Sequence, residues 1–461
     1  MAAAVRATAA PAARGMAATA TDNGDRAGRP GRPDHSLTTL DSGVRVITER
    51  VPGVRSVALG FLIDTGSVVE RAEQAGISHL LEHMLFRGTE HYGSQEIDQL
   101  FDEMGAEINA GTDKESTTLY TRVLDGHLER AFDVMADMIW RPCFGELDAE
   151  KDVVLEEIAM YEDDPQDRVF DLAGRAVFGS HPLGRPVIGT AQAVGAVDRD
   201  QLSAFHAERY RPGSIVIAAA GSVEHEALVA LVQAAQGGAA AGGGAAARPE
   251  LGAPRFSSRV EFLQKDTEQY HVCIGGRGLA RDDERRFALR VLEGILGGTS
   301  SSRLFQEVRE RRGLAYSVFS YSNLYAGTGE VGVYVGTRPE NLDEALEVVA
   351  AELRRCVVDP ASEQELVRSR ENLKGRMVLA LESTSARMGR LGGSLLADIP
   401  ILSADEVIER IDAVGIDDVR ELAGELFAPE RLSVAAVGPA EDSFARAAGA
   451  LQAEASAGGR P

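Results

Sequence analysis

The sequence has few of the residues that build disulfide frameworks, membrane spans or basic binding surfaces. Only three of its 461 residues are cysteines, which excludes a disulfide framework and a four-cysteine zinc module and fits a reducing compartment. No apolar run reaches the roughly 18 residues that a membrane span needs. Lys and Arg number 48 against 71 Asp and Glu, a net charge of −23, which argues against nucleic acid or anionic membrane as a partner and is compatible with basic peptides or cations.

The composition changes along the chain and divides it into two domain-sized pieces. Residues 1–36 are rich in Ala, Arg, Pro and Gly, and so little bulky apolar surface predicts a disordered tail. Residues 236–254 are a Gly/Ala-rich stretch closed by prolines, which predicts a flexible linker. We therefore expect an N-terminal domain at 37–235, a C-terminal domain at 255–445 and a flexible tail at 446–461.

The two predicted domains resemble each other. Pro212–Gly221 and Pro429–Gly438 have the same pattern, a proline followed by an apolar run that ends at glycine, and they are offset by 217 residues. Leu81–Leu85 likewise resembles Leu292–Leu296. Self-similarity at a fixed offset is typical of a duplicated unit. The sequence therefore predicts a duplicated α+β domain joined by a hinge.

A predicted helix near residues 76–87 contains two histidines and a glutamate in the order His79-Leu-Leu-Glu82-His83. It follows two predicted strands, 44–48 and 56–64, which we expect to form a hairpin around a Pro-Gly turn. Residues four apart lie on one face of a helix, so both imidazoles reach one zinc ion. A glutamate beside them is placed to accept a proton from the attacking water. The alternative interpretation is two surface histidines on an amphipathic helix.

A second helical pattern, residues 148–161, offers a third ligand. Glu150 and Glu157 are seven residues apart and share a face of that helix. Glu157 would complete a site of two histidines and one carboxylate, which is a catalytic type of zinc coordination. Glu150 would orient a ligand or water. The alternative is that acids on a helix are solvated surface groups, which is how we interpret Glu156 and Glu162.

These motifs resemble the pitrilysin/insulinase family of zinc peptidases, in particular the group that contains the mitochondrial processing peptidase β-subunit and its small bacterial homologues. Gly76–Thr89 is similar to the family signature almost letter for letter, and Glu150–Glu157 is similar to its second glutamate-bearing helix. The resemblance implies that His79, His83 and Glu157 bind the metal and that Glu82 is the general base. It also implies that Glu150 matches the second conserved glutamate of the family.

The resemblance also covers residues that would contact the substrate. In the second half, a Gly/Ser-rich stretch leads to Arg309 and Tyr316, which in the family reach across to the substrate, the arginine holding a carbonyl and the tyrosine stabilising the oxyanion. In the first half, the resemblance implies an edge strand that pairs with an extended peptide. Its residues are Asn109, Ala110, Gly111 and Thr112.

We therefore expect an α+β fold of two homologous domains, each a mainly antiparallel sheet covered by helices, arranged as a clamshell. The expected function is zinc-dependent endopeptidase, acting on peptides or unfolded, presequence-like segments. Arg290 and Gly294 align with His79 and His83, so we expect one Zn²⁺ per chain. The resemblance implies a homodimer in the bacterial cytoplasm, with the mitochondrial matrix as the alternative location. The alternative function is a non-catalytic structural or partner subunit of a processing-peptidase-like complex.

Overall fold

The computed structural model describes residues 35–236, 244–249 and 251–457. The predicted disordered tail, apart from its last two residues, and the middle of the predicted linker lie outside these residues. Helix α15 covers residues 446–457 of the predicted flexible tail, a stretch rich in alanine, the residue with the highest helix propensity.

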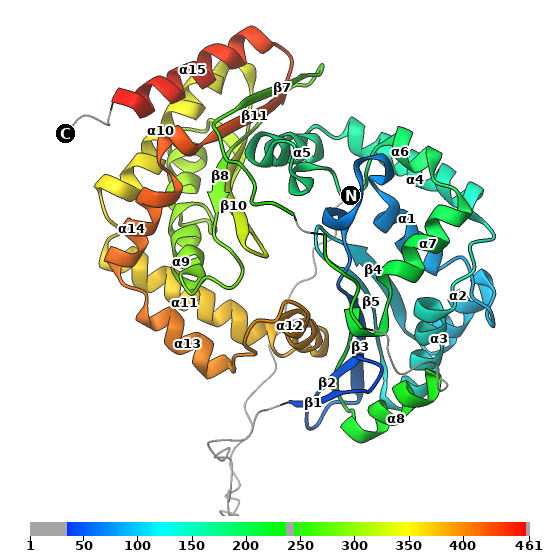
Figure 1. Cartoon of the computed structure of the whole chain (residues 1–461). Coiled ribbons are helices and arrows are strands. Elements are labelled where there is room, and N and C mark those ends of the chain that lie inside the picture. The colour runs from blue at the N-terminus through cyan, green and yellow to red at the C-terminus, as the bar shows by residue number, and fades with distance from the viewer. Residues whose placement is uncertain (1–34, 237–243, 250, 458–461) are drawn as a thin grey trace, which may run out of the picture. The chain divides into compact units, whose positions relative to one another are not determined.

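Within the described residues, the chain forms two sheets covered by helices (Figure 1). The strands of the first half are β1 (Ser36–Thr39), β2 (Arg45–Arg50), β3 (Ser56–Ile63), β4 (Glu107–Thr112), β5 (Thr117–Leu124) and β6 (Ile215–Gly221). Its helices are α1 (Ile77–Leu85), α2 (Ser94–Glu103), α3 (Leu128–Trp140), α4 (Leu147–Asp163), α5 (Pro165–Phe178), α6 (Ala191–Ala196), α7 (Arg199–Arg209) and α8 (His225–Ala235).

The second half repeats this sequence of elements. Its strands are β7 (Val260–Gln264), β8 (Tyr270–Gly278), β9 (Ala315–Tyr325), β10 (Thr328–Thr337) and β11 (Ser433–Gly438). Its helices are α9 (Arg286–Leu296), α10 (Leu342–Val358), α11 (Glu363–Ala380), α12 (Thr384–Leu396), α13 (Ala404–Ala413), α14 (Ile416–Leu426) and α15 (Glu441–Ala457), and a π-helical turn spans Phe305–Arg311.

The two sheets have the same topology. The strand order is β1-β2-β6-β3-β5-β4 in the first sheet and β7-β11-β8-β10-β9 in the second. One pair in each sheet is parallel, β2 with β6 and β7 with β11, and the other pairs are antiparallel. Apart from β1, every strand of the first sheet has a counterpart at the same place in the second. The predicted α+β fold of two homologous, mainly antiparallel domains is confirmed.

The predicted hairpin between the first two strands is wrong. Strand β6 lies between β2 and β3, so that Ala218 is paired with Ile47 on one side and with Gly60 on the other. Because β6 comes from the far end of the first half, no local pattern around the Pro-Gly turn reveals the insertion. The turn is present, but the strands that flank it are not neighbours.

Each half lends one helix to the sheet of the other half (Figure 1). Helix α5 packs on β11 and β8, where Val169 and Ala173 join a buried cluster with Tyr334. Helix α12 packs on β3 and β6, where Met388 and Leu391 join another buried cluster. A sheet face that carries apolar side chains must be covered, and here the two covering helices are exchanged.

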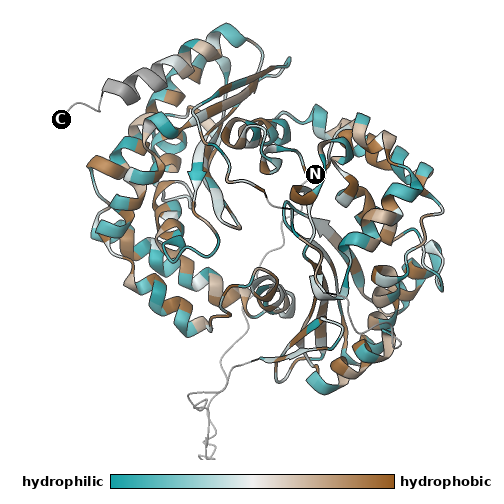
Figure 2. Cartoon of the chain, viewed as in Figure 1, coloured by the Kyte–Doolittle hydropathy of each residue, from teal (hydrophilic) through white to brown (hydrophobic). Residues whose placement is uncertain are grey.

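Hydrophobic residues are spread over the strands and helices of both halves (Figure 2), and the buried ones form one large cluster in each half. The core of the first half includes Phe61, Phe132 and Leu81, all without solvent exposure. The apolar side of α1 therefore lies in this core, so the polar side of the helix points away from it. No helix among the described residues combines the length and the hydropathy needed to cross a bilayer.

Candidate metal centre and active site

Helix α1 is fixed at its N-terminus by a buried carboxylate. Gly76 precedes the helix with φ +96°, a conformation that favours glycine. Glu70 accepts hydrogen bonds from the backbone N–H groups of Gly76 (2.8 Å) and Ser78 (2.9 Å), as expected for an acid at a helix N-terminus. The buried face of α1 comprises Ile77, Leu80, Leu81, Met84 and Leu85. The other face of α1, which carries both histidines and Glu82, lies towards α4 and β4.

His79, His83 and Glu157 come together at the contact between α1 and α4. One ligand atom from each lies within 4.8 Å of the others. The Nε2 atoms of His79 and His83 are 3.7 and 3.4 Å from Glu157 Oε2. Two imidazole nitrogens and a carboxylate oxygen around one point form a donor set that suits zinc, with a coordination position left for water. These are the three residues for which the sequence predicted convergence.

The two imidazoles are prepared for binding in different ways. Burial, with a smaller contribution from His83, lowers the pKa of His79 to about 4, so its ring is neutral at pH 7 and carries a free lone pair. His83 Nδ1 lies 2.8 Å from Glu150 Oε1, which leaves Nε2 directed to the site. Glu150 also accepts a hydrogen bond from Arg87, and its side chain is only 4% exposed. The donor set therefore fits a bound metal ion.

Glu82 lies beside the predicted metal ligands, but its hydrogen-bond partner is on strand β4. The hydroxyl of Thr112, at the end of β4, donates a hydrogen bond to Glu82 Oε2 at 2.6 Å. Burial raises the pKa of Glu82, and this hydrogen bond acts in the opposite direction. Glu82 is thus a carboxylate next to the metal-binding group and is not itself one of its three members.

The predicted edge strand is found at the edge. Strand β4 is terminal in the order of the first sheet, and its exposed and half-buried residues alternate. Asn109, Ala110, Gly111 and Thr112 pair with β5 on one side only. Within the described residues no strand pairs with the other side of their backbone, but the Ala110 N–H donates to the Asn109 side chain at 2.8 Å and the Thr112 N–H donates to Glu82. A further strand at this edge would replace these local hydrogen bonds.

Arg309 and Tyr316 lie side by side in the second half. The guanidinium of Arg309 stacks over the Tyr316 ring at 4.4 Å and donates to the Tyr316 carbonyl at 3.1 Å. The side chain of Tyr316 is 77% exposed. Among the described residues, neither lines the cavity beside the metal-binding group.

That cavity, of about 350 Å³, begins at His79 and Glu157 and extends to the second half. Besides Glu157, its carboxyl groups are Asp167 and Asp171 from α5 and Glu330 from β10. Burial raises the pKa of both Asp171 and Glu330, the latter to about 7. Lys114 also lines the cavity, and its charge favours ionisation of both groups.

Several polar residues of this region are not predicted by the sequence. Arg87 belongs to the motif Gly76–Thr89, but nothing in the sequence indicates its contact with Glu150. Asp167 and Asp171 are four residues apart on α5, a spacing that places them on one helix face and that could have been noticed. The place of Glu330 in this cavity could not be predicted, because its strand belongs to the other half of the chain and no local pattern links it to the metal ligands.

Family models match most of the ordered chain. The model described as insulinase, peptidase family M16, matches residues 45–191, and the model described as peptidase M16 inactive domain matches residues 196–373. A relative from Streptomyces coelicolor, named as an uncharacterized zinc protease, is 42% identical over 88% of this chain and 90% of its own length. The chain belongs to the insulinase family, peptidase family M16. The Bacillus subtilis relative YmxG, named in the same way, is 41% identical over 87% of this chain and 97% of its own length.

Solved structures have the same M16 fold at lower identity. An M16 inactive-domain protein from Pseudomonas fluorescens matches with a TM-score of 0.82 and 23% identity, over 88% of this chain and 99% of that one. A protease from Helicobacter pylori matches with a TM-score of 0.81 and 21% identity, over 88% and 100%. The inactive-domain model covers the half in which Arg290 and Gly294 occupy the positions of His79 and His83.

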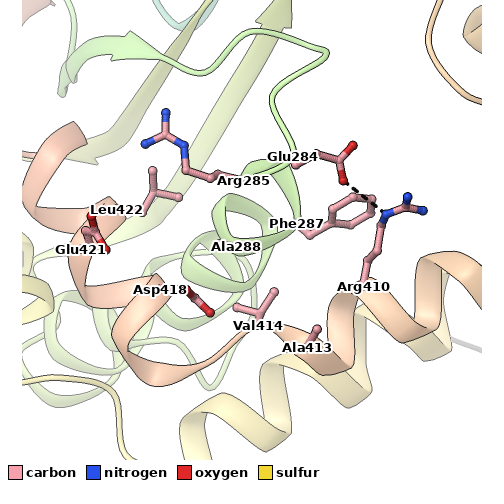
Figure 3. Close-up of a pocket in the computed structure, with 10 residues that line it drawn as sticks. All are labelled: Glu284, Arg285, Phe287, Ala288, Arg410, Ala413, Val414, Asp418, Glu421 and Leu422. Atoms are coloured by element: carbon pink, nitrogen blue, oxygen red, sulfur yellow. Dashed lines mark ion pairs between the residues drawn. The ribbon is translucent and has the colours of Figure 1, made fainter.

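This M16 chain has another cavity, of about 320 Å³, between α9, α13 and α14 of the second half (Figure 3). Phe287 and Leu422 contribute apolar lining, and Arg410 pairs with Glu284 at 3.3 Å. Arg410 also lies 5.8 Å from the centre of the Phe287 ring. Arg285, which also lines this cavity, pairs with Asp283 and Glu425, and the proposed metal ligands described above lie in the other half.

Proposed function

We propose that this chain is a zinc-dependent endopeptidase. The observation that carries the proposal is the convergence of His79, His83 and Glu157 on one point. Glu82 lies beside them and accepts a hydrogen bond from Thr112. The names of the relatives from Streptomyces coelicolor and Bacillus subtilis, which are called zinc proteases, support the same metal and the same reaction class.

In the proposed mechanism, an extended peptide pairs with the free edge of β4. Zinc held by the three ligands would lower the pKa of a water molecule and polarise the scissile carbonyl. Glu82 accepts the proton of the attacking water and delivers it to the leaving amine. Glu150 holds the ring of His83 in orientation through Nδ1.

Arg309 and Tyr316 enter the mechanism only through a movement of the two halves. Both lie outside the cavity beside the metal-binding group, so their proposed contacts with the substrate carbonyl and the oxyanion require closure. Closure of this kind excludes water and completes a catalytic site in many enzymes.

The cavity beside the ligands supports a preference for basic peptides. Besides the predicted ligand Glu157, the acids Asp167, Asp171 and Glu330 line it against one ammonium group, that of Lys114. Glu330 has a pKa of about 7, so it carries only part of a charge at neutral pH. The net charge of −23 attracts cationic peptides over a longer range. We therefore propose arginine- or lysine-containing peptides as the substrate class. The family resemblance implies a homodimer, which we propose as the assembly.

The proposal is tested with the purified chain and two quenched fluorescent peptides that differ only by an arginine or a glutamine. We expect faster cleavage of the arginine peptide, loss of cleavage with a chelator and recovery with zinc. Glu82→Gln should keep one zinc per chain while the rate falls about 10²- to 10⁴-fold. Glu157→Gln should lower the zinc content, whereas the exposed neighbour Glu156→Gln should behave like the wild type.

The opposite outcomes have distinct meanings. Near-normal turnover of Glu82→Gln would remove the general-base assignment. Wild-type protein that binds zinc but cleaves neither peptide would favour the non-catalytic subunit instead.

A further inference from the structure

The hydroxyl group of Thr112 has one proton, and its surroundings direct that proton to Glu82. The distance from Thr112 Oγ1 to Glu82 Oε2 is 2.6 Å, in the range of an O–H···O⁻ hydrogen bond to a charged acceptor. Thr117 Oγ1 is a more distant and uncharged oxygen, at 3.3 Å. The Thr117 hydroxyl donates to the Thr65 carbonyl at 2.9 Å, so it has no second proton to offer to Thr112.

Thr112 is also held firmly by its position in the sheet. It is the last residue of β4 and is paired with Thr117 of β5. A β-branched residue in a strand has a restricted χ1 angle, so the hydroxyl cannot easily turn away. Glu82, by contrast, has three side-chain torsions and a carboxylate that rotates broadly about its last one.

We propose that Thr112 is a positioning residue for Glu82. It fixes one carboxylate oxygen so that the other faces the attacking water. This inference rests on the proposed function, in which Glu82 is the general base. Because a residue acting in this way sets geometry rather than affinity, its loss should change kcat more than KM.

The same contact links substrate binding to the base. Strand β4 is the edge along which the peptide is proposed to pair, and its terminal side chain holds Glu82. A peptide that pairs along the whole of Asn109–Thr112 therefore ends beside the side chain that holds the carboxylate. Short peptides that do not reach Thr112 should gain less from this contact than peptides that span the whole strand.

The test compares Thr112→Val, which lacks the hydroxyl, with Thr112→Ser, which keeps it. We expect Thr112→Val to lower kcat about 10- to 100-fold with KM within about twofold, and with one zinc per chain retained. Thr112→Ser should stay within about threefold of wild type. Thr112→Ala also lacks the hydroxyl, adds no volume and should fall by the same factor as Thr112→Val. Thr118→Val, the same change on the opposite face of the hairpin, is the matched control.

A double-mutant comparison separates positioning from a structural role. If Thr112 acts through Glu82, Thr112→Val should cause no further loss in the Glu82→Gln background. An unchanged kcat in both Thr112→Val and Thr112→Ala would overturn the inference, as would equal damage by Thr112→Ser. If the wild type cleaves and Glu82→Gln does not, such a result contradicts only the role of Thr112. If the wild type shows no zinc-dependent cleavage, the proposed function itself has failed.

Discussion

At the scale of single residues, the polar side of α1 works through contacts with other elements. His83 is oriented by Glu150 from α4, and Glu82 by Thr112 from β4. Burial keeps His79 neutral by lowering its pKa to about 4. A helix of nine residues thus carries two of the proposed ligands and the proposed base, and their orientations depend on α4 and β4.

The contact between Glu150 and His83 gives a prediction about metal affinity. Glu150→Ala removes the acceptor for His83 Nδ1 and frees the ring to rotate, so the zinc dissociation constant should rise about 10- to 100-fold. Competition with a fluorescent zinc chelator measures this constant. Glu156→Ala, an exposed glutamate on the same helix, is the control and should leave it unchanged. Equal constants for the wild type and Glu150→Ala would remove Glu150 from this role.

At the scale of elements, the exchange of α5 and α12 joins the two halves. Glycines allow α12 to approach the first sheet closely, because a Cβ atom at Gly392 would lie 2.5 Å from Leu62 Cδ1. Glu49 of β2, whose side chain is 4% exposed, pairs with both Arg387 and Arg390 of α12. A buried carboxylate of this kind is stabilised only while its partners are present.

Glu49→Gln therefore should lower the free energy of unfolding by about 2 kcal/mol, since it leaves two arginines without their anion. Urea unfolding followed by the fluorescence of Trp140, the single tryptophan, measures the change. The control is Glu224→Gln, which removes an exposed ion pair with Arg50 and should cost less than about 1 kcal/mol. An equal effect of the two substitutions would contradict the account of the α12 contact.

The features that could be predicted from the sequence are those that depend on residues close together in the chain. Helices α1 and α4 follow from apolar spacing, and the spacing of His79 and His83, with Glu157 two turns beyond Glu150, indicated the metal group. The insertion of β6 between β2 and β3 could not be predicted, because strand order depends on contacts between distant segments. The exchange of α5 and α12 was equally hidden, since an apolar helix face does not indicate which sheet it covers.

At the scale of the whole molecule, the cavity that begins at the proposed metal ligands of the first half extends to a buried acid of the second half, Glu330. Glu330 lies on β10 with its two oxygens near the Tyr321 hydroxyl (3.2 Å) and the Asn323 amide (3.5 Å). Burial raises its pKa to about 7. The folded protein therefore holds a proton between pH 4.5 and 7 that the unfolded chain has already lost.

Stability should accordingly fall as the pH rises through this window, because the folded state binds the extra proton. The stability that protonation of Glu330 adds to the folded state is complete below about pH 4.5 and is lost by about pH 8. For a pKa shift of this size it is at most about 3 kcal/mol. Glu330→Gln removes it, so the difference in unfolding free energy between variant and wild type should grow from pH 5 to pH 8. Glu268→Gln, an exposed change of the same charge, is the control. Parallel pH curves for Glu330→Gln and the wild type would contradict the prediction.

Helices α1 and α4 are proposed to bind a single zinc ion, and X-ray anomalous scattering at the zinc edge from crystals of the purified protein would locate that ion. We expect one peak per chain at about 2.0–2.2 Å from the nearest donor atoms of His79, His83 and Glu157, and none at Arg290 or Gly294. A peak at another site, or a peak bonded to the histidines with Glu157 turned away, would contradict it.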